Sequence, residues 1–230
     1  TKDKPELSVI MPGVRLERWV EVYNSIIRST TRSFELIIAT PFAAKVPPWF
    51  WALSNIKIIQ DLGSPVRAQC LAASMAEGKL ITWLSDDGIY VPHGLDVAID
   101  RFYMMEENKK NTVVYKYAEG EKAYTDEYFK INFHRGANEE GIGSEHIPDN
   151  YYLLNNPIMY RDYYYELGGL DCSYECTAMA LADFAIRAQY DGAIVEFLER
   201  IPILMCTQDA AHQGNHSLVA NAQTQHDEPL

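Results

Sequence analysis

Three consecutive side chains that carry oxygen, Ser85, Asp86 and Asp87, follow an apolar run in the stretch ITWLSDDG. Burying an unpaired carboxylate is unfavourable, so two aspartates at the end of a buried strand require a partner. Carboxylate and hydroxyl oxygens are the ligands that Mg²⁺ and Mn²⁺ prefer, and such an ion usually also binds the phosphates of a substrate. The motif therefore predicts a divalent-metal site that faces a diphosphate. The alternative is that these side chains cap the first amides of a helix.

The elements that must position this motif are strands and helices that alternate along the first 120 residues. Strands are predicted where short β-branched runs end at a turn-forming or polar residue, at 7–12, 34–41, 55–61, 79–85 and 111–119. Helices are predicted where apolar residues recur at helical spacing, at 15–29, 64–79 and 92–108. This order implies right-handed crossovers and a mainly parallel sheet with helices on both faces. Ligands of such sheets bind beyond the carboxyl ends of the strands, which is where the two aspartates fall.

The second half of the chain is less regular. Residues 119–150 are polar and rich in glycine, so we expect a long loop or hairpin there, and residues 151–175 are dense in tyrosine. Residues 180–193 have helical spacing, and 194–203 are typical of one or two strands ahead of a polar tail. The sequence therefore predicts a regular α/β half followed by an irregular one.

Charge and cysteine content exclude several classes of protein. The chain has 20 basic and 32 acidic residues, a net charge of −12, which makes it a poor binder of nucleic acid or of an anionic membrane. No apolar run reaches the roughly 20 residues of a membrane helix, and the polar start TKDKPE is unlike a signal peptide. The four cysteines include one close pair, C-x-x-x-C, and no second pair that would complete a zinc site. We therefore expect free thiols, which are typical of a reducing compartment. We therefore expect a soluble, cytoplasmic protein, and Thr1 indicates that an initiator methionine or more of a longer chain is missing.

Several motifs follow one another in a fixed order. They are LSVIMP and a helix, then FELIIATP, then SPVRAQCLAASMAEGKLITWLSDDG with a proline five residues after the second aspartate, and finally ELGGLD with D-x-x-x-R-x-x-x-x-G downstream. This ordered set resembles family 2 glycosyltransferases of the GT-A fold, over residues 7–93 and more loosely over 155–200. The resemblance implies an α/β fold: a GT-A (Rossmann-like), mainly parallel sheet flanked by helices, with a less regular C-terminal acceptor-side half. It implies a single domain over 1–230, with the nucleotide-sugar half at about 7–120, the acceptor and catalytic half at about 121–210, and a tail at 211–230.

On the donor side, the resemblance implies a nucleotide-diphospho-sugar held through a D-x-D-type motif and Mn²⁺ or Mg²⁺. Asp87 would be the direct metal ligand, and Ser85 and Asp86 would turn toward the ribose or the donor sugar. Similar enzymes often close the metal site with a C-terminal histidine, here His212 or His216. The nucleoside would lie against residues that follow the first two strands, namely Pro12, Gly13, Val14, Arg15 and Thr40.

Two departures from the family pattern bear on the donor. The family often has an acidic residue after its second strand that contacts the nucleobase, whereas this chain has TPF at 40–42. The identity of the nucleobase is therefore open, although we favour a UDP-sugar. The usual Arg-Asn pair at the start of the next helix is replaced by VRAQC at 66–70. Arg67 can still bind a diphosphate through its forked guanidinium, or it is simply a solvated arginine. Asp61 and Gln69 are candidate nucleoside contacts.

On the acceptor side, inverting transfer needs a carboxylate that takes the proton from the attacking hydroxyl. In the resembled family this base lies at a helix start that reads E-D-x-D-L-x-x-R, and Asp183 and Arg187 match its latter half. The earlier E-D falls at residues 180–181, which are Ala-Leu, so the base is Asp183 or else Glu175. The alternative is that Asp183 and Arg187 form only a structural ion pair. The acceptor-side loop of the family is matched by two residues of GGLD, Gly169 and Asp171.

The resemblance thus predicts a metal-dependent, inverting glycosyltransferase that moves a hexosyl or deoxyhexosyl group from a nucleotide-diphosphate donor to a glycan hydroxyl. Its partners would be the donor, a glycan or glycoconjugate acceptor, and any further domains of a longer chain. A nucleotidyltransferase is a rival of the same fold, but it needs a glycine-rich basic loop where PGVRLERW has one glycine. A non-catalytic nucleotide- or carbohydrate-binding module is favoured by the missing E-D pair. A metal-dependent phosphohydrolase is the third rival, and it would release inorganic phosphate.

Overall fold

The computed structural model describes residues 4–119, 129–130, 151–198, 202–206 and 226–227. Within them a seven-stranded sheet forms the centre, in the spatial order β10-β6-β9-β4-β1-β2-β3. Its strands are β1 Leu7–Pro12, β2 Phe34–Thr40, β3 Ile56–Gln60, β4 Leu80–Trp83, β6 Asn111–Tyr115, β9 Pro157–Tyr160 and β10 Ile194–Leu198. All are parallel except β9, which runs antiparallel to both β4 and β6. The sheet is therefore mainly parallel, as predicted, and both halves of the chain contribute strands to it.

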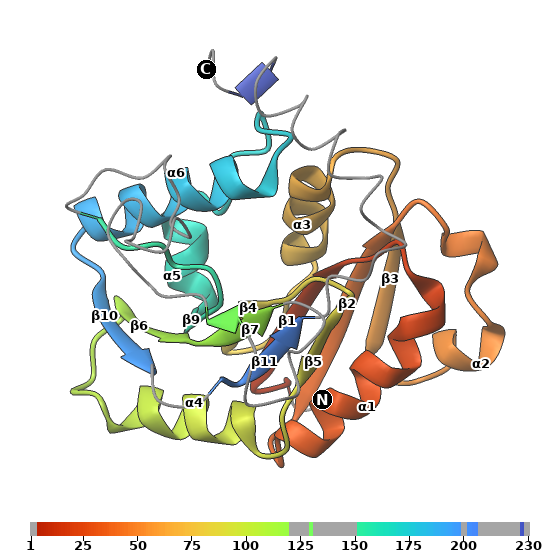
Figure 1. Ribbon diagram of the computed structural model, residues 1–230, viewed down its shortest axis with the longest axis horizontal. Coiled ribbons are helices and arrows are strands. Elements are labelled where there is room, and N and C mark those ends of the chain that lie inside the picture. The colour runs from red at the N-terminus through yellow and green to blue at the C-terminus, as the bar shows by residue number, and fades with distance from the viewer. Residues whose placement is uncertain (1–3, 120–128, 131–150, 199–201, 207–225, 228–230) are drawn as a thin grey trace.

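Helices cover both faces of this sheet, as Figure 1 shows. One face carries α1 Trp19–Ser29 and α4 Gly94–Met104, and the other carries α3 Pro65–Ser74, α5 Arg161–Glu166 and α6 Thr177–Tyr190. Each face has its own apolar core, with Trp19 and Phe102 in the first and Val66 and Phe184 in the second. Among the described residues, no helix is both long and apolar enough to cross a membrane.

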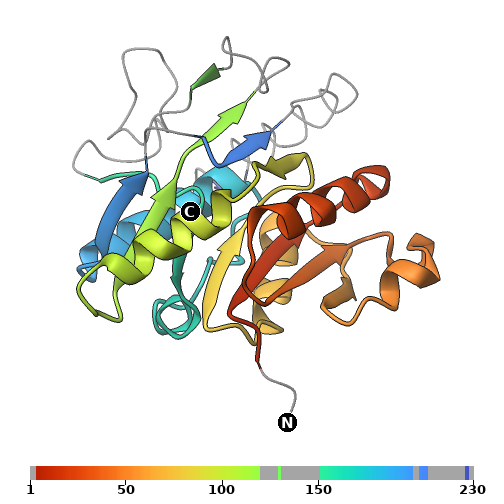
Figure 2. The same ribbon diagram turned by 90° about the horizontal axis from the view of Figure 1, so that it is seen from below.

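A second, four-stranded sheet lies beyond the carboxyl ends of β4 and β6 (Figure 2). Its order is β5-β11-β7-β8, with bounds β5 Gly88–Tyr90, β7 Tyr117–Glu119, β8 Phe129–Lys130 and β11 Leu204–Cys206. β5 begins directly after Asp87 and pairs antiparallel with β11, which comes from a distant part of the chain. The loop that carries the S-D-D motif therefore connects the two sheets.

The predicted helices are present, with different ends. The helix predicted at 15–29 begins with a 3-10 turn, η1 Leu16–Arg18, ahead of α1. The helix predicted at 64–79 has Ser64 as its N-cap, with the hydroxyl accepting a backbone N–H at 3.2 Å, but it ends at Ser74. Those predicted at 92–108 and 180–193 correspond to α4 and α6.

Among the described elements, strands β5, β9 and β11 and the short helices α2 and α5 were not predicted, and β8 lies within the segment predicted as a loop or hairpin. β9 and α5 lie within the tyrosine-dense segment, and β5 and β11 are three residues each, too short for a periodic pattern. A further 3-10 turn, η2 Ala43–Lys45, and helix α2 Pro48–Trp51 follow β2. The single strand predicted at 111–119 is divided at Lys116, whose carbonyl accepts from the Ile203 amide (2.8 Å), so that β7 joins the second sheet. Most of the predicted loop at 119–150 lies outside the described residues.

A buried carboxylate ties the amino ends of three strands together. Glu35, at the start of β2, is 4% exposed; its Oε1 accepts from the Ser8 hydroxyl of β1 (2.6 Å), and its Oε2 pairs with Lys57 Nζ of β3 (2.7 Å). The amides of Glu77 and Gly78, in the turn before β4, donate to the same Oε1 at 2.6 and 3.2 Å. A side chain at Gly78 would place its Cβ 2.6 Å from the Ser8 nitrogen, so the turn needs glycine. Glu35 thereby links β1, β2, β3 and the turn before β4, which lie side by side at one edge of the sheet.

We expect Glu35→Gln to lower the free energy of unfolding by about 1.5–3 kcal/mol, because charge-assisted hydrogen bonds to a buried group are lost. Urea unfolding followed by far-UV circular dichroism measures the change. Glu21→Gln, on the exposed face of α1, is the matched control and should leave stability unchanged. Equal effects of the two substitutions would contradict the anchoring role of Glu35.

Candidate functional site

The Asp86 carboxylate is directed into the protein. Its Oδ2 accepts from the backbone amides of Val14 and Arg15 (both 2.6 Å) and from the Trp19 indole N–H (3.3 Å), and its Oδ1 pairs with the Arg15 guanidinium. The Asp86 side chain is only 2% exposed. This carboxylate therefore joins the loop after β1 and the start of α1 to the loop after β4.

This orientation differs from the expectation that Asp86 faces the ribose or the donor sugar. Both of its oxygens are engaged by the chain, and Arg15 supplies the compensating charge. Gly13 follows Pro12, the last residue of β1. It packs against Trp19 so closely that an added Cβ would lie 2.8 Å from the indole ring. Val14 remains 45% exposed beside them. The loop that was predicted to contact the nucleoside is thus held in place by Asp86.

Asp87 lies half-buried in the same loop, and within the described residues its carboxylate is bonded only by the exposed Ser85 hydroxyl. These two side chains offer hard oxygen ligands at the carboxyl end of β4. No group of three histidine, cysteine, aspartate or glutamate side chains within the described residues could hold a metal by itself. Mg²⁺ is commonly bound by one or two carboxylates together with substrate phosphates, so this pair fits a cation shared with a ligand. The predicted ligands His212 and His216 lie outside the described residues.

The predicted nucleoside contacts after β2 and β3 are also engaged locally. Thr40 is fully buried and accepts the Phe42 amide at 3.1 Å. Asp61, 5% exposed, accepts the Gly63 amide and the Arg67 Nε, both at 3.1 Å. The Arg67 side chain is 61% exposed, so most of it remains accessible at the start of α3.

Gln69 carries a donor that has no partner. It lies in the second turn of α3 on the side that faces the sheet and is 3% exposed, yet its Nε2 forms no hydrogen bond with the described residues. A buried N–H without an acceptor costs about 1–3 kcal/mol and is rare in folded proteins. Within the described residues, this amide is therefore the predicted nucleoside contact whose donor is not engaged by the chain.

On the acceptor side, Asp183 and Arg187 form the ion pair that their spacing predicts. Asp183 Oδ2 accepts from Arg187 Nε and Nη2 at 2.9 and 2.7 Å, and the Asp183 side chain is 26% exposed. Arg187 also donates to the carbonyls of Leu167 and Gly169, which ties α6 to the GGLD loop. Gly169 has φ +66, a backbone conformation that favours glycine.

The other acceptor-side candidates lie between that loop and α6. Asp171 accepts the hydroxyl and the amide of Ser173, which lowers the pKa of its carboxyl. Glu175 is exposed, and its carboxylate forms no hydrogen bond with the described residues. Ala180 is fully buried in the apolar cluster that contains Phe184, so the family's E-D pair has no place there.

Two further residues of this region were missed by the sequence analysis. Tyr174 is half-buried, and burial raises the pKa of its hydroxyl. The carboxylates of Asp183, Asp171 and Asp227 raise this pKa further, whereas the Arg187 guanidinium lowers it. Asp227 binds backbone amides just before α6. Tyr174 was indistinguishable within a tyrosine-rich segment, and Asp227 was part of a tail with no pattern.

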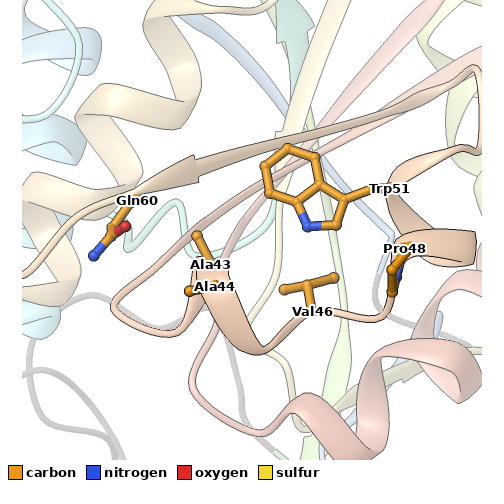
Figure 3. Close-up of a pocket in the computed structure, with 6 residues that line it drawn as sticks. All are labelled: Ala43, Ala44, Val46, Pro48, Trp51 and Gln60. Atoms are coloured by element: carbon orange, nitrogen blue, oxygen red, sulfur yellow. The ribbon is translucent and has the colours of Figure 1, made fainter.

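A shallow pocket of about 630 Å³ lies beside β3 (Figure 3). It is mainly apolar, and its lining residues are Ala43, Ala44, Val46, Pro48, Trp51 and Gln60. None of the candidate site residues lines this pocket, although Gln60 directly precedes Asp61. The pocket is therefore separate from the carboxylates described above.

The architecture is that of the GT-A, Rossmann-like fold. The chain is similar to two crystal structures of TarS from S. aureus. The likeness to TarS 1-349 has 15% identity and a TM-score of 0.63, and it covers 96% of this chain and 66% of that one. The likeness to the second TarS structure has 16% identity and a TM-score of 0.64, and it covers 88% of this chain and 36% of that one. At these identities the likeness shows the fold, and the chain spans less than two thirds of either TarS chain. No family model and no curated protein matches the sequence.

The two adjacent aspartates should respond differently to substitution. Asp86→Asn leaves the Arg15 guanidinium unpaired, so we expect a loss of about 2–4 kcal/mol in the free energy of unfolding. Asp87→Asn should change it by less than about 0.5 kcal/mol, because its carboxylate supports only a hydroxyl at the surface. Urea unfolding of both variants tests this, and similar losses would contradict the division of roles.

Proposed function

We propose that the protein is a glycosyltransferase, which moves a sugar from a nucleoside-diphosphate donor to a hydroxyl of a glycan. The observation that carries this proposal is the placement of Asp87 and Ser85 at the carboxyl end of β4, where ligands of such sheets bind. The shared fold supports it, because TarS is a wall teichoic acid glycosyltransferase. Membership of family 2, inverting stereochemistry and a UDP-sugar donor are narrower parts of the same proposal.

The donor would be bound by groups from the loop after β4, from α3 and from the C-terminal part of the chain. Asp87 and Ser85 would hold Mn²⁺ or Mg²⁺, which stabilises the negative charge of a departing diphosphate. Arg67 has the exposure and the forked geometry to bind phosphate oxygens, and Gln69 has a buried N–H that requires an acceptor. His212 or His216 remains the proposed further ligand.

The acceptor hydroxyl would lose its proton to a carboxylate as it attacks the sugar. Asp183 suits this role because Arg187 holds its Oδ2 and fixes the side chain, which leaves Oδ1 for the acceptor. Glu175 is the second candidate, since it is exposed near the same helix start. Gly169 and Asp171 would border the acceptor.

A non-catalytic donor-binding module is the alternative, and the burial of Ala180 at the place of the family's carboxylates favours it. It differs from the enzyme in one outcome. The module would bind a nucleotide-sugar without ever releasing the nucleoside diphosphate, even to water.

Donor class can be tested by thermal shift with UDP, GDP, dTDP and CDP, each with and without Mn²⁺. We expect one nucleotide to stabilise the protein only with metal, by about 2.7 kcal/mol at a hundredfold excess over Kd. Asp87→Ala should abolish this effect, whereas Asp162→Ala, an exposed aspartate of α5, should retain it. Absence of any response in the wild-type protein would overturn the proposed function.

The base can be assigned by comparing Asp183→Asn with Glu175→Gln in release of nucleoside diphosphate from the donor sugar. If Asp183 is the base, its variant should lose about 10²–10⁴-fold in kcat with the donor Kd nearly unchanged, while Glu175→Gln stays close to wild type. The opposite ranking would assign the base to Glu175.

A further inference from the structure

Asp227 delivers a carboxylate to the start of α6 from 51 residues further along the chain. Its Oδ1 accepts the Glu175 amide at 2.9 Å, and its Oδ2 accepts the Cys176 amide at 2.6 Å. His226 Nδ1 lies 2.7 Å from Oδ1. The Asp227 side chain is 0% exposed, and Figure 1 shows residues 226–227 near the segment that leads into α6.

The start of α6 has no capping group of its own. Cys176 is the N-cap, its side chain makes no capping hydrogen bond, and the first turn contains no acidic residue. Negative charge near a helix N-terminus is favourable, and amide bonds to an ionised acceptor are stronger than neutral ones. Asp227 supplies negative charge at this helix start, and it binds the amide of the N-cap residue Cys176 and the amide before it.

Burial opposes the charge of Asp227, but the hydrogen bonds from Glu175, His226 and Cys176 outweigh it and hold the pKa of this carboxyl below its ordinary value. The hydrogen bond to Asp227 also raises the pKa of His226. The lowered pKa keeps the carboxyl ionised at neutral pH, which strengthens its hydrogen bonds to the two amides.

The segment that Asp227 holds carries groups of the candidate acceptor site. Glu175 is one of the two candidate bases, and its own amide is bound by Asp227. Tyr174, the residue before Glu175, donates its backbone amide to the Asp171 carbonyl at 3.3 Å, which connects this segment to the GGLD loop. The direction of the chain between the GGLD loop and α6 is thus set in part by Asp227.

We propose that Asp227 is a positioning residue, which fixes the backbone of Glu175 and Cys176 at the start of α6 and thereby places Glu175 relative to Asp183 of that helix. The inference rests on the proposed function for its catalytic consequence. Its structural part, the holding of two amides by a distant carboxylate, is independent of that function.

Amide hydrogen exchange tests the structural part directly. In Asp227→Ala the amides of Glu175 and Cys176 should exchange faster, because their acceptor is gone. Asp227→Asn, which keeps one acceptor oxygen and loses the charge, should be intermediate, and it serves if the alanine variant does not fold. Unchanged exchange at both amides in either folded variant would overturn the inference.

The catalytic part is tested by kcat and KM for release of nucleoside diphosphate from UDP-, GDP-, dTDP- and CDP-sugars with Mn²⁺. Asp227→Ala should lower kcat by about tenfold or more with the donor KM changed by less than about threefold, because misplacement of catalytic groups affects the chemical step. Asp191→Asn is the matched control at the other end of α6, where Asp191 pairs with Lys110 at 2.9 Å, and it should keep wild-type kcat.

The two proposals fail in different ways. A wild-type protein that releases no nucleoside diphosphate from any of these donors overturns the proposed function, while the exchange measurement still reports on Asp227. An active wild type and an Asp227→Ala variant with the same kcat overturn the positioning role alone. A parallel fall in kcat and in donor affinity would also overturn it, because the donor site would then be affected.

Discussion

Four N–H donors converge on the buried carboxylate of Asp86, and through them three separate pieces of chain meet at one edge of the sheet. A charge in that position is tolerated because Arg15 neutralises it and two backbone amides complete its hydrogen bonding. The loop after β1, the start of α1 and the loop after β4 are consequently fixed relative to one another. The neighbouring Asp87 is bonded only by the Ser85 hydroxyl within the described chain, so its carboxylate is the one of the pair that the fold does not engage.

The acceptor side is organised by ion pairs around α6. Arg187 connects Asp183 to two carbonyls of the GGLD loop, so the orientation of the carboxylate and the path of that loop depend on one guanidinium. At the other end of the same segment, Asp227 binds the amides that precede the helix. A carboxylate from a distant part of the chain, Asp227, therefore lies at a helix start whose own sequence is apolar at 178–182.

The sequence predicted the parts of the fold that depend on local patterns. β1 to β4 and helices α1, α3, α4 and α6 each have a periodic apolar face or a clear cap, as with Ser64 and Pro65 of α3. β5, β9 and β11 have three or four residues, and their pairing is decided by tertiary contacts that no local pattern contains. The S-D-D motif likewise indicated which residue types are present, but it could not indicate which way each side chain points. The amides that hold the Asp86 carboxylate inside the protein lie 71 and 72 positions earlier in the chain. For the same reason Asp227 could not be found from the chain around it.

The pairing of β5 with β11 has a consequence for the order in which the protein becomes competent. Gly88, the residue after Asp87, is paired with Cys206. The Leu204 side chain packs so closely against Gly88 that an added Cβ on Gly88 would lie 3.0 Å from it. A nascent chain emerges from the ribosome with its N-terminus first, so β1 to β4 can assemble before β11 has been synthesised. The loop that carries Asp87 can therefore reach its final shape only after β11 has been made. Cation binding at Asp87 would then follow the pairing of β5 with β11, and it would report that this pairing has formed.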